Sequence, residues 1–150
     1  MAGSIGLRAN RGVRFAGYAA LFDKVDRGGD VVKRGAFAGV GAGAVPGAVS
    51  VPLCLQHDGN KRIGRIEMLA EDERGLRVVA RLHNWTPAAR AAADALKAGK
   101  LTGLSFGYRV RESGPGLVSG ARRTLTALDL VEVSLVEHPM QPKARVHMVG

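Results

Sequence analysis

Two residues of this 150-residue chain have the types and surroundings that hydrolytic chemistry requires. Ser105 lies between Gly103 and Gly107, and this spacing leaves room for a substrate backbone beside the serine hydroxyl. His57 follows an apolar run and begins a turn, where a partly exposed imidazole keeps its pKa near working pH and can act as a general base. A serine in a glycine-rich strand and a histidine in a turn are also common structural residues, so neither identifies a site alone.

A third residue, Glu132, is unusual because it interrupts the apolar stretch 128–136. Strand alternation puts Glu132 and Ser134 on one face, and both faces of the stretch are mainly apolar, as in a strand covered on both sides. A carboxylate in such a strand must be paired or must shift its pKa, and an imidazole is a suitable partner. The alternative is that the strand lies at a sheet edge, where Glu132 reaches water.

A nucleophile, a base and an orienting carboxylate are therefore available in Ser105, His57 and Glu132. His138 is a minor candidate for the third position. The letters around Ser105 also match the nucleophile elbow G-x-S-x-G, but that motif needs a strand, a turn and a helix in this order. Here a helix precedes the serine and strand-like residues follow it. Cys54 is a weaker nucleophile candidate, because a small buried core residue is the simpler interpretation.

No metal or cofactor is expected from the remaining polar residues. The aspartates of the loop 23–30 lack the spacing of an EF-hand, and His83, His138 and His147 are too scattered to indicate zinc. The segment 98–102 (AGKLT) lacks the first glycine of a phosphate-binding loop.

The elements that must position these residues are mainly strands. Strand-like runs are expected over 13–22, 51–56, 62–70, 76–82, 101–110 and 125–136, with a short final strand over 144–149. The clearest helix is 86–98, with Thr86 as its N-cap and Pro87 at its first position. A second, short helix is expected over 35–40, followed by a surface loop over 41–50. We therefore predict a mainly β fold with helices, a closed or nearly closed barrel.

One domain is expected over 13–150, preceded by a flexible segment over 1–12 that lacks the apolar region of a signal peptide. The net charge is +9, and the cations are spread along the chain. This charge suits an acidic protein partner, nucleic acid or a membrane surface, or it is simply a solvated surface. The single cysteine excludes an intramolecular disulfide, and no apolar run is long enough to span a membrane.

Several blocks, in this order, resemble the prohead (capsid maturation) serine proteases of tailed bacteriophages. They are GYAALFD with RGAF (17–37), LQHD with IGRI (55–66), GLRVVARL (75–82), LKAGKLTGLSFGY (96–108) and LDLVEVSLVEHPMQPKARV (128–146). The resemblance runs over 15–146, nearly the whole chain. It implies a fold similar to the herpesvirus assembly proteases, a β-barrel surrounded by a few helices.

The resemblance also implies roles for the three residues. His57 is expected as the base and Ser105 as the nucleophile, and the place of the second histidine of the herpesvirus enzymes is taken here by Glu132. The arginine pair that helps to hold the oxyanion in those enzymes is absent after this strand. Backbone amides near Phe106 are the first candidates for that role, before the side chains of Arg109 and Arg145.

The implied function is a serine endopeptidase that cleaves the capsid precursor or scaffold protein inside the assembling prohead, in the bacterial host cytoplasm, and that cleaves itself. Activation by self-association is also implied. Two other interpretations stay open. One is a catalytically silent capsid-assembly protein with a protease fold, and the other is a basic barrel that binds nucleic acid. The second lacks stacking aromatics, since only Phe106 and Tyr108 are spaced for that purpose.

Overall fold

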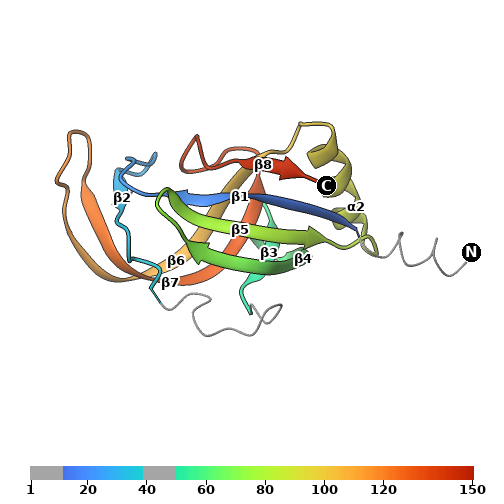
Figure 1. The fold of residues 1–150 in the computed structure, drawn as a ribbon, viewed down its shortest axis with the longest axis horizontal. Coiled ribbons are helices and arrows are strands. Elements are labelled where there is room, and N and C mark those ends of the chain that lie inside the picture. The colour runs from blue at the N-terminus through green and yellow to red at the C-terminus, as the bar shows by residue number, and fades with distance from the viewer. Residues whose placement is uncertain (1–11, 39–49) are drawn as a thin grey trace, which may run out of the picture.

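A computed structural model describes residues 12–38 and 50–150. These residues form one curled sheet of eight strands and one helix (Figure 1). The elements are β1 (Val13–Leu21), β2 (Asp30–Val32), β3 (Pro52–Leu55), β4 (Asp58–Glu71), β5 (Gly75–Leu82), α2 (Pro87–Lys97), β6 (Gly103–Pro115), β7 (Arg123–Val136) and β8 (Val146–Val149). The strand order is β2-β7-β3-β4-β5-β1-β8, and β6 pairs with the remaining side of β7.

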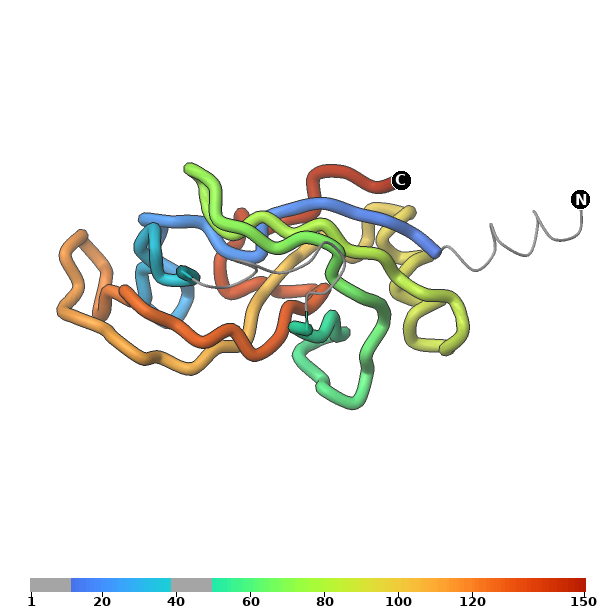
Figure 2. The backbone as a smooth tube through the Cα atoms, turned by 60° about the horizontal axis from the view of Figure 1, so that its bottom comes forward, coloured from blue at the N-terminus to red at the C-terminus, as the bar shows by residue number. Residues whose placement is uncertain are grey.

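The sheet curls until its two ends meet. The strands β8, β1, β5 and β4 lie over β6, β7 and β3, as both Figure 1 and Figure 2 show. The first residue of β6, Gly103, forms an isolated antiparallel bridge with Arg145, and the Leu104 amide donates to the carbonyl of Ala144 at 2.9 Å. These contacts close the curl, so the predicted barrel is confirmed in outline.

One core fills the space inside the curl. Inward-facing residues of every long strand contribute to it, among them Phe15, Ile66, Leu76 and Leu135, all at most 2% exposed. Alternate residues of β5 are buried, as expected for strands with one face against a core. The core is mainly aliphatic, and the four phenylalanines of the chain, Phe15, Phe22, Phe37 and Phe106, all belong to it.

The helix α2 begins and ends as its sequence predicts. The Ala89 amide donates to Oγ1 of Thr86 at 3.2 Å, and Gly99 adopts a left-handed conformation just past the last turn. Ala89, Ala92 and Leu96 are spaced for one helical face and are buried in the core. Truncation of Leu96 to alanine would cost about 2–5 kcal/mol of stability.

The short strand β2 is fixed to β7 by a buried carboxylate. Asp30 is 9% exposed and accepts from Nε and Nη2 of Arg123, at 3.0 and 2.9 Å. The Tyr108 hydroxyl donates to the same carboxylate at 3.2 Å. The Arg123 guanidinium holds the pKa of Asp30 below its usual range, whereas burial and Asp30 raise the pKa of Tyr108 to about 12.

Several local predictions differ from the structure. Residues 35–38 form successive turns rather than the start of a helix, because Ala36 and Ala38 bond three residues back. The rest of that segment, most of the loop 41–50, and nearly all of the flexible segment 1–12 lie outside the described residues. The strand predicted from Arg62 begins at Asp58, and β6 extends to Pro115, because β-pairing continues through residues that looked like turns. Among the described residues, no helix has the length and apolarity needed to cross a membrane.

Candidate active site

His57 lies in a tight turn between β3 and β4. Leu55 pairs with Asp58, so Gln56 and His57 are the two central residues of the connection. Both have positive φ, 53° and 62°. This is the geometry of a primed hairpin turn, which normally uses asparagine or glycine because other side chains strain there. Such strain persists only where the surroundings hold it in place, and it is often found at functional sites.

Hydrogen bonds to β7 hold this turn in place. The Gln56 amide donates to the carbonyl of Leu135 at 2.9 Å, and its side-chain oxygen accepts from the Glu137 amide at 3.1 Å. The His57 amide donates to Oγ of Ser134 at 3.2 Å. The turn is therefore fixed against the strand that carries Glu132, whatever the conformation of the imidazole.

The imidazole of His57 meets the carboxylate of Glu132. Nδ1 of His57 lies 2.5 Å from Oε1 of Glu132, and the Ser134 hydroxyl donates to Oε2 at 2.5 Å. The hydrogen bond to Glu132 raises the pKa of His57, against a smaller opposing effect of burial. With Nδ1 held by the carboxylate, Nε2 is the nitrogen left to exchange a proton, as a general base requires.

The residue opposite Glu132 on β6 is a glycine, whose missing side chain leaves room for the carboxylate. Gly107 pairs with Glu132, and a Cβ atom at Gly107 would lie 2.6 Å from Oε1. The register then shifts, so that Tyr108 pairs with Leu130 and Val131 is left as a bulge residue, 44% exposed. Bulges change the direction of neighbouring side chains, and this one lies directly beside the carboxylate.

Glu132 does not lie at a sheet edge. The strand β7 is paired with β6 on one side and with β2 and β3 on the other, and Glu132 is 9% exposed. The alternative in which Glu132 reaches water is therefore wrong. Burial on both faces holds only for 132–136, because Asp129 and Val131 are exposed.

Ser105 lies on β6, directly opposite Ser134, so its side chain is on the same sheet face as the His57–Glu132 pair. It is 3% exposed. Within the described part of the chain, its hydroxyl takes part in none of the side-chain hydrogen bonds, and it is not bonded to His57. The structure thus joins His57 to Glu132 and places Ser105 on the adjacent strand.

The two glycines that flank Ser105 are closely approached by neighbouring residues. The space beside Gly107 is filled by the Glu132 carboxylate. A Cβ atom at Gly103 would lie 2.5 Å from the carbonyl oxygen of Val136 and 2.9 Å from Pro139. Close packing thus accounts for both glycines, and room for a substrate backbone beside Ser105 stays a prediction.

The other candidate residues have different surroundings. Cys54 is fully buried, and burial is the first cause that raises the pKa of its thiol, which disfavours the reactive thiolate. His138 is exposed, and His83 stacks on Trp85 with ring centroids 3.9 Å apart. Among the described residues no cluster of His, Cys, Asp and Glu could hold a metal ion.

The candidates for an oxyanion donor also differ. Nε of Arg145 donates to the carbonyl of Pro142 at 2.8 Å, and its Nη1 donates to Oγ1 of Thr102 at 3.2 Å. Arg145 is bridged to Gly103, two residues from Ser105, whereas Arg109 is exposed further along β6. Arg145 is thus the side chain that β-pairing places nearer to the serine.

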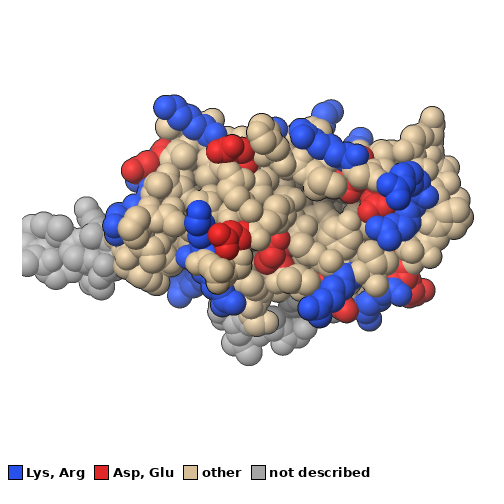
Figure 3. All heavy atoms as spheres, turned by 180° about the vertical axis from the view of Figure 1, so that it is seen from behind, with Lys and Arg blue, Asp and Glu red and all other residues tan. Residues whose placement is uncertain are grey.

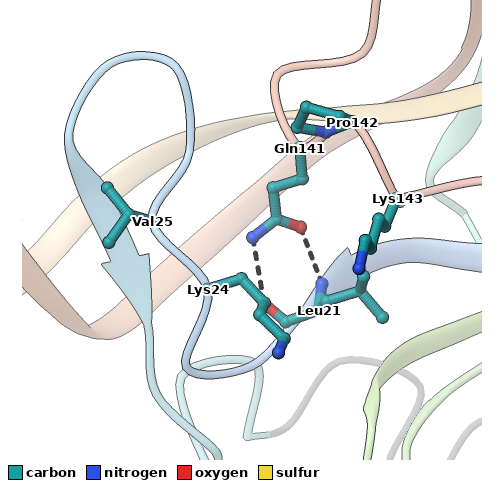
Figure 4. Close-up of a pocket in the computed structure, with 6 residues that line it drawn as sticks. All are labelled: Leu21, Lys24, Val25, Gln141, Pro142 and Lys143. Atoms are coloured by element: carbon teal, nitrogen blue, oxygen red, sulfur yellow. Dashed lines mark hydrogen bonds between the residues drawn. The ribbon is translucent and has the colours of Figure 1, made fainter.

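A surface hollow of about 220 Å³ lies away from these residues along the chain, between the end of β1 and the loop after β7 (Figure 4). Its lining comprises Leu21, Lys24, Val25, Gln141, Pro142 and Lys143. The Gln141 side chain accepts from the Leu21 amide at 2.7 Å and donates to its carbonyl at 2.9 Å. The polar groups of the Gln141 side chain therefore hold the loop after β7 to the end of β1.

The aromatic pair considered for nucleic-acid stacking is also engaged elsewhere. Phe106 is 8% exposed and packs edge-on against Phe37, while the Tyr108 hydroxyl bonds to Asp30. Neither ring is presented as a platform to a base. This removes the only aromatic feature that favoured a nucleic-acid-binding barrel.

Sequence reasoning missed Gln56 and Ser134 as parts of this site, and it named Gly107 only as a neighbour of Ser105. The signal for Ser134 was present, because alternation placed it on the same face as Glu132. No pattern in the sequence indicates the positive φ of Gln56 or the pairing of Gly107 with Glu132, because both depend on strand register.

Comparisons with known proteins give consistent matches. A family model described as caudovirus prohead serine protease matches residues 4–150. The prohead protease of Enterobacteria phage HK97 is 30% identical over 136 residues, which cover 88% of this chain and 58% of that protein. The chain thus spans little more than half the length of this relative. The structure of KSHV protease in complex with a hexapeptide phosphonate inhibitor matches with a TM-score of 0.52 and 13% identity, over 93% of this chain and 65% of that one.

Proposed function

Because the chain belongs to the caudovirus prohead serine protease family, we propose that it is a serine endopeptidase acting on the capsid precursor or scaffold protein inside the assembling prohead. Ser105 is the nucleophile, His57 the general base and Glu132 the orienting carboxylate. Cleavage of its own chain belongs to the same proposal, as does an action within the host cytoplasm, where such a shell assembles.

One observation supports the proposal above the others. A buried carboxylate holds Nδ1 of a histidine whose side chain is 42% exposed, on the sheet face that carries a serine one strand away. A purely structural carboxylate at this place would be served as well by an arginine, which cannot release its proton. An imidazole is the partner that can both pair with the carboxylate and accept a proton.

The chemistry proceeds by acyl transfer. Oγ of Ser105 attacks the peptide carbonyl carbon while Nε2 of His57 takes the hydroxyl proton. Glu132 stabilises the imidazolium that results and keeps the proton on Nδ1. The imidazolium then protonates the leaving amine as the C–N bond breaks, and water, activated by the same imidazole, releases the acyl group from Ser105. The tetrahedral oxyanion needs donors, with the amides near Phe106 as first candidates and Arg145 as the second.

The low exposure of Ser105 sets a requirement for this mechanism. A residue 3% exposed cannot meet a peptide carbonyl until its neighbours move. Substrate binding or self-association would have to uncover the hydroxyl and bring it to Nε2 of His57, since catalytic hydrogen bonds often form only in the bound state. The same observation favours the second candidate function, a catalytically silent assembly protein that keeps the protease fold.

Covalent labelling separates the two candidates. A fluorophosphonate reacts with an activated serine, so we expect it to label the active protein at Ser105, identified by mass spectrometry. Ser113 is the matched control, because it lies on the same strand and is exposed. Labelling of Ser113 but not Ser105 would favour the silent protein.

Co-expression with the capsid precursor tests the substrate. Wild-type protein should shorten the precursor on a gel, Ser105→Ala should leave it intact, and Ser113→Ala should behave as wild type. Removal of the nucleophile of a triad lowers kcat by up to about 10⁶. Equal trimming by the wild type and Ser105→Ala would overturn the assignment of the nucleophile.

A further inference from the structure

The outer face of β8, β1, β5 and β4 has an ordered pattern of side chains that the proposed site does not use. These four strands are consecutive neighbours in the sheet, and no other described element crosses in front of them in Figure 1. Their register relates each residue to its neighbour across the sheet. Directly opposed residues of antiparallel strands have their side chains on the same face, so the rows of this surface can be followed from strand to strand.

The central row is apolar. Ala16 of β1 pairs with Met148 of β8 on one side and with Val79 of β5 on the other, and Val79 pairs with Met68 of β4. Ala16 is buried, at 4% exposed, whereas Val79 is half-buried. The two methionines are 59% and 36% exposed, so Met148, Val79 and Met68 form the accessible part of an apolar stripe, with Ala16 buried between Met148 and Val79.

A row of arginines lies on one side of this stripe. Arg81 of β5 pairs with Arg14 of β1 and with Arg65 of β4. All three approach a single carboxylate, Glu67, at 2.8 Å from Arg14, 3.8 Å from Arg65 and 3.6 Å from Arg81. Like charges placed directly opposite one another destabilise a sheet, and here a single carboxylate faces three cations, so the row favours further negative charge from outside.

The other side of the stripe is also basic. Tyr18 of β1 pairs with Arg77 of β5, and the Arg74 guanidinium lies 5.5 Å from the centre of the Tyr18 ring. The Tyr18 hydroxyl donates to Asp72 at 2.5 Å. The two flanking rows thus contain four arginines beside Glu67, and the turn between β4 and β5 adds Arg74 together with Asp72 and Glu73. On the face seen in Figure 3, by contrast, Lys and Arg are interspersed with Asp and Glu.

We propose that this face docks an acidic amphipathic helix, whose apolar side chains lie along the methionine row and whose Asp and Glu side chains pair with the arginines on both sides. The dimensions agree. Four adjacent strands span about 14 Å, the length of roughly ten helical residues, and the flanking rows lie about 7 Å from the stripe. Methionine suits such a surface because its flexible side chain adapts to the partner.

The proposed function identifies the polypeptide that carries this helix as the capsid precursor or scaffold, and this part of the inference rests on it. Docking at a face outside the catalytic network would hold the substrate near the protease while a separate segment enters the site. Weak binding at the catalytic residues then suffices, because the docked chain is present at a high effective concentration. The chemistry of the surface itself does not depend on catalysis.

Binding can be measured without cleavage. The full-length uncleaved capsid precursor is titrated into the Ser105→Ala protein at 50 and 200 mM salt by calorimetry. We expect saturable binding that weakens at least tenfold at the higher salt, because exposed charge pairs are screened. No binding, or binding indifferent to salt, would overturn the proposal. If the precursor binds in this way but the wild-type protein leaves it untrimmed, the proposed function would be overturned instead.

Two variants locate the surface. Arg14→Gln combined with Arg65→Gln removes two exposed cations while Glu67 keeps Arg81, and Met148→Asp puts a like charge opposite the acidic helix. Each should weaken binding at least tenfold. Lys97→Gln combined with Lys100→Gln, on and after α2, removes the same charge elsewhere and should change binding less than threefold. Circular dichroism checks that each variant is folded. Equal weakening by the control and by the arginine variant would show a non-specific charge effect and overturn the docking face.

Discussion

Two buried carboxylates, each 9% exposed, lie towards opposite ends of β7, Asp30 beside its first residue and Glu132 near its C-terminal end, and they differ in the partner that neutralises them. At one end, Asp30 accepts two hydrogen bonds from the guanidinium of Arg123. At the other end, Glu132 holds Nδ1 of His57. Each carboxylate also accepts a hydrogen bond from a hydroxyl group, Asp30 from Tyr108 and Glu132 from Ser134.

The difference lies in the proton. Arginine stays charged at any working pH, so the Asp30 pair is a fixed link between β2 and β7. Histidine changes its charge near neutral pH, and the hydrogen bond to Glu132 raises its pKa. Similar burial and similar hydrogen bonding thus give a structural site at one end of the strand and a site able to move a proton at the other.

The largest expected effect is on catalysis, from Glu132→Gln. The amide leaves the shape in place but cannot stabilise an imidazolium, so the rate of precursor trimming should fall by about 10²–10⁴. Glu132 is the main cause that raises the pKa of His57, so the acid limb of the pH–rate profile should move to lower pH. The matched control is His138→Ala, which should trim as wild type. If only His138→Ala loses trimming, the third catalytic residue is His138 and the assignment of Glu132 is wrong.

The corresponding change at the other end, Asp30→Asn, should act on stability. It leaves a guanidinium that has lost its partner beside β2, at a cost of about 1–3 kcal/mol in the free energy of unfolding. This cost is smaller than the cost of breaking a fully buried ion pair, because the Arg123 side chain is 43% exposed. The rate of trimming by the folded protein should be unchanged. Chemical denaturation measures the first quantity, and a hundredfold loss of trimming would contradict the division between the two sites.

The pH dependence of this stability sharpens the contrast. Arg123 keeps the pKa of Asp30 below its unfolded value, so the contribution is present above that value and is lost as pH falls through the folded one. The difference between wild type and Asp30→Asn should therefore stay constant between about pH 5 and 8, and should shrink below about pH 4.

A smaller effect on catalysis is expected from Ser134→Ala. This hydroxyl is completely buried, and it links the His57 backbone to Glu132, so its loss should lower trimming by about tenfold through misplacement of the pair. Thr124→Val is the control, because it removes another β7 hydroxyl with a 2.8 Å bond, to the Pro115 carbonyl, far along the strand. Combined with Glu132→Gln, Ser134→Ala should add little, since both act through one network. Full additivity would indicate a general structural role.

Much of the fold could be predicted from the sequence because its signals are local. Alternation and turns located most strands, and the Thr86 cap, the alanine-rich interior and Gly99 located α2. The wrong prediction of a helix from Gly35 has a physical reason. The segment is short, and its amides at Gly35 and Phe37 donate hydrogen bonds to the carboxylate of Glu71, a distant residue that no local pattern contains.

The site could be predicted only in part. An isolated carboxylate in an apolar strand indicated that Glu132 needed a partner, and the structure supplies His57 from 75 residues away. The bulge at Val131 and the contact of Glu132 with Gly107 depend on the register of β6 against β7, which single-strand patterns do not determine. The catalytic roles themselves stay predictions, because position alone does not measure reactivity.

The smallest expected effect is the pH-linked stability of the His57 pair. The folded pKa of His57 is raised above its unfolded value of about 6.5, so the ion pair stabilises the protein below that pH, and this contribution is lost as pH rises through the folded pKa. The melting temperature of wild type should thus exceed that of His57→Gln by more at pH 5.5 than at pH 8.5. We expect a change of roughly 1–2 °C, because the imidazole is 42% exposed and such pairs contribute little. Asp30→Asn, measured in parallel, should show the same difference from wild type at both pH values. If the His57→Gln difference is equally flat, the imidazole does not exchange its proton in this range, and the proposed distinction between the two ends of β7 fails.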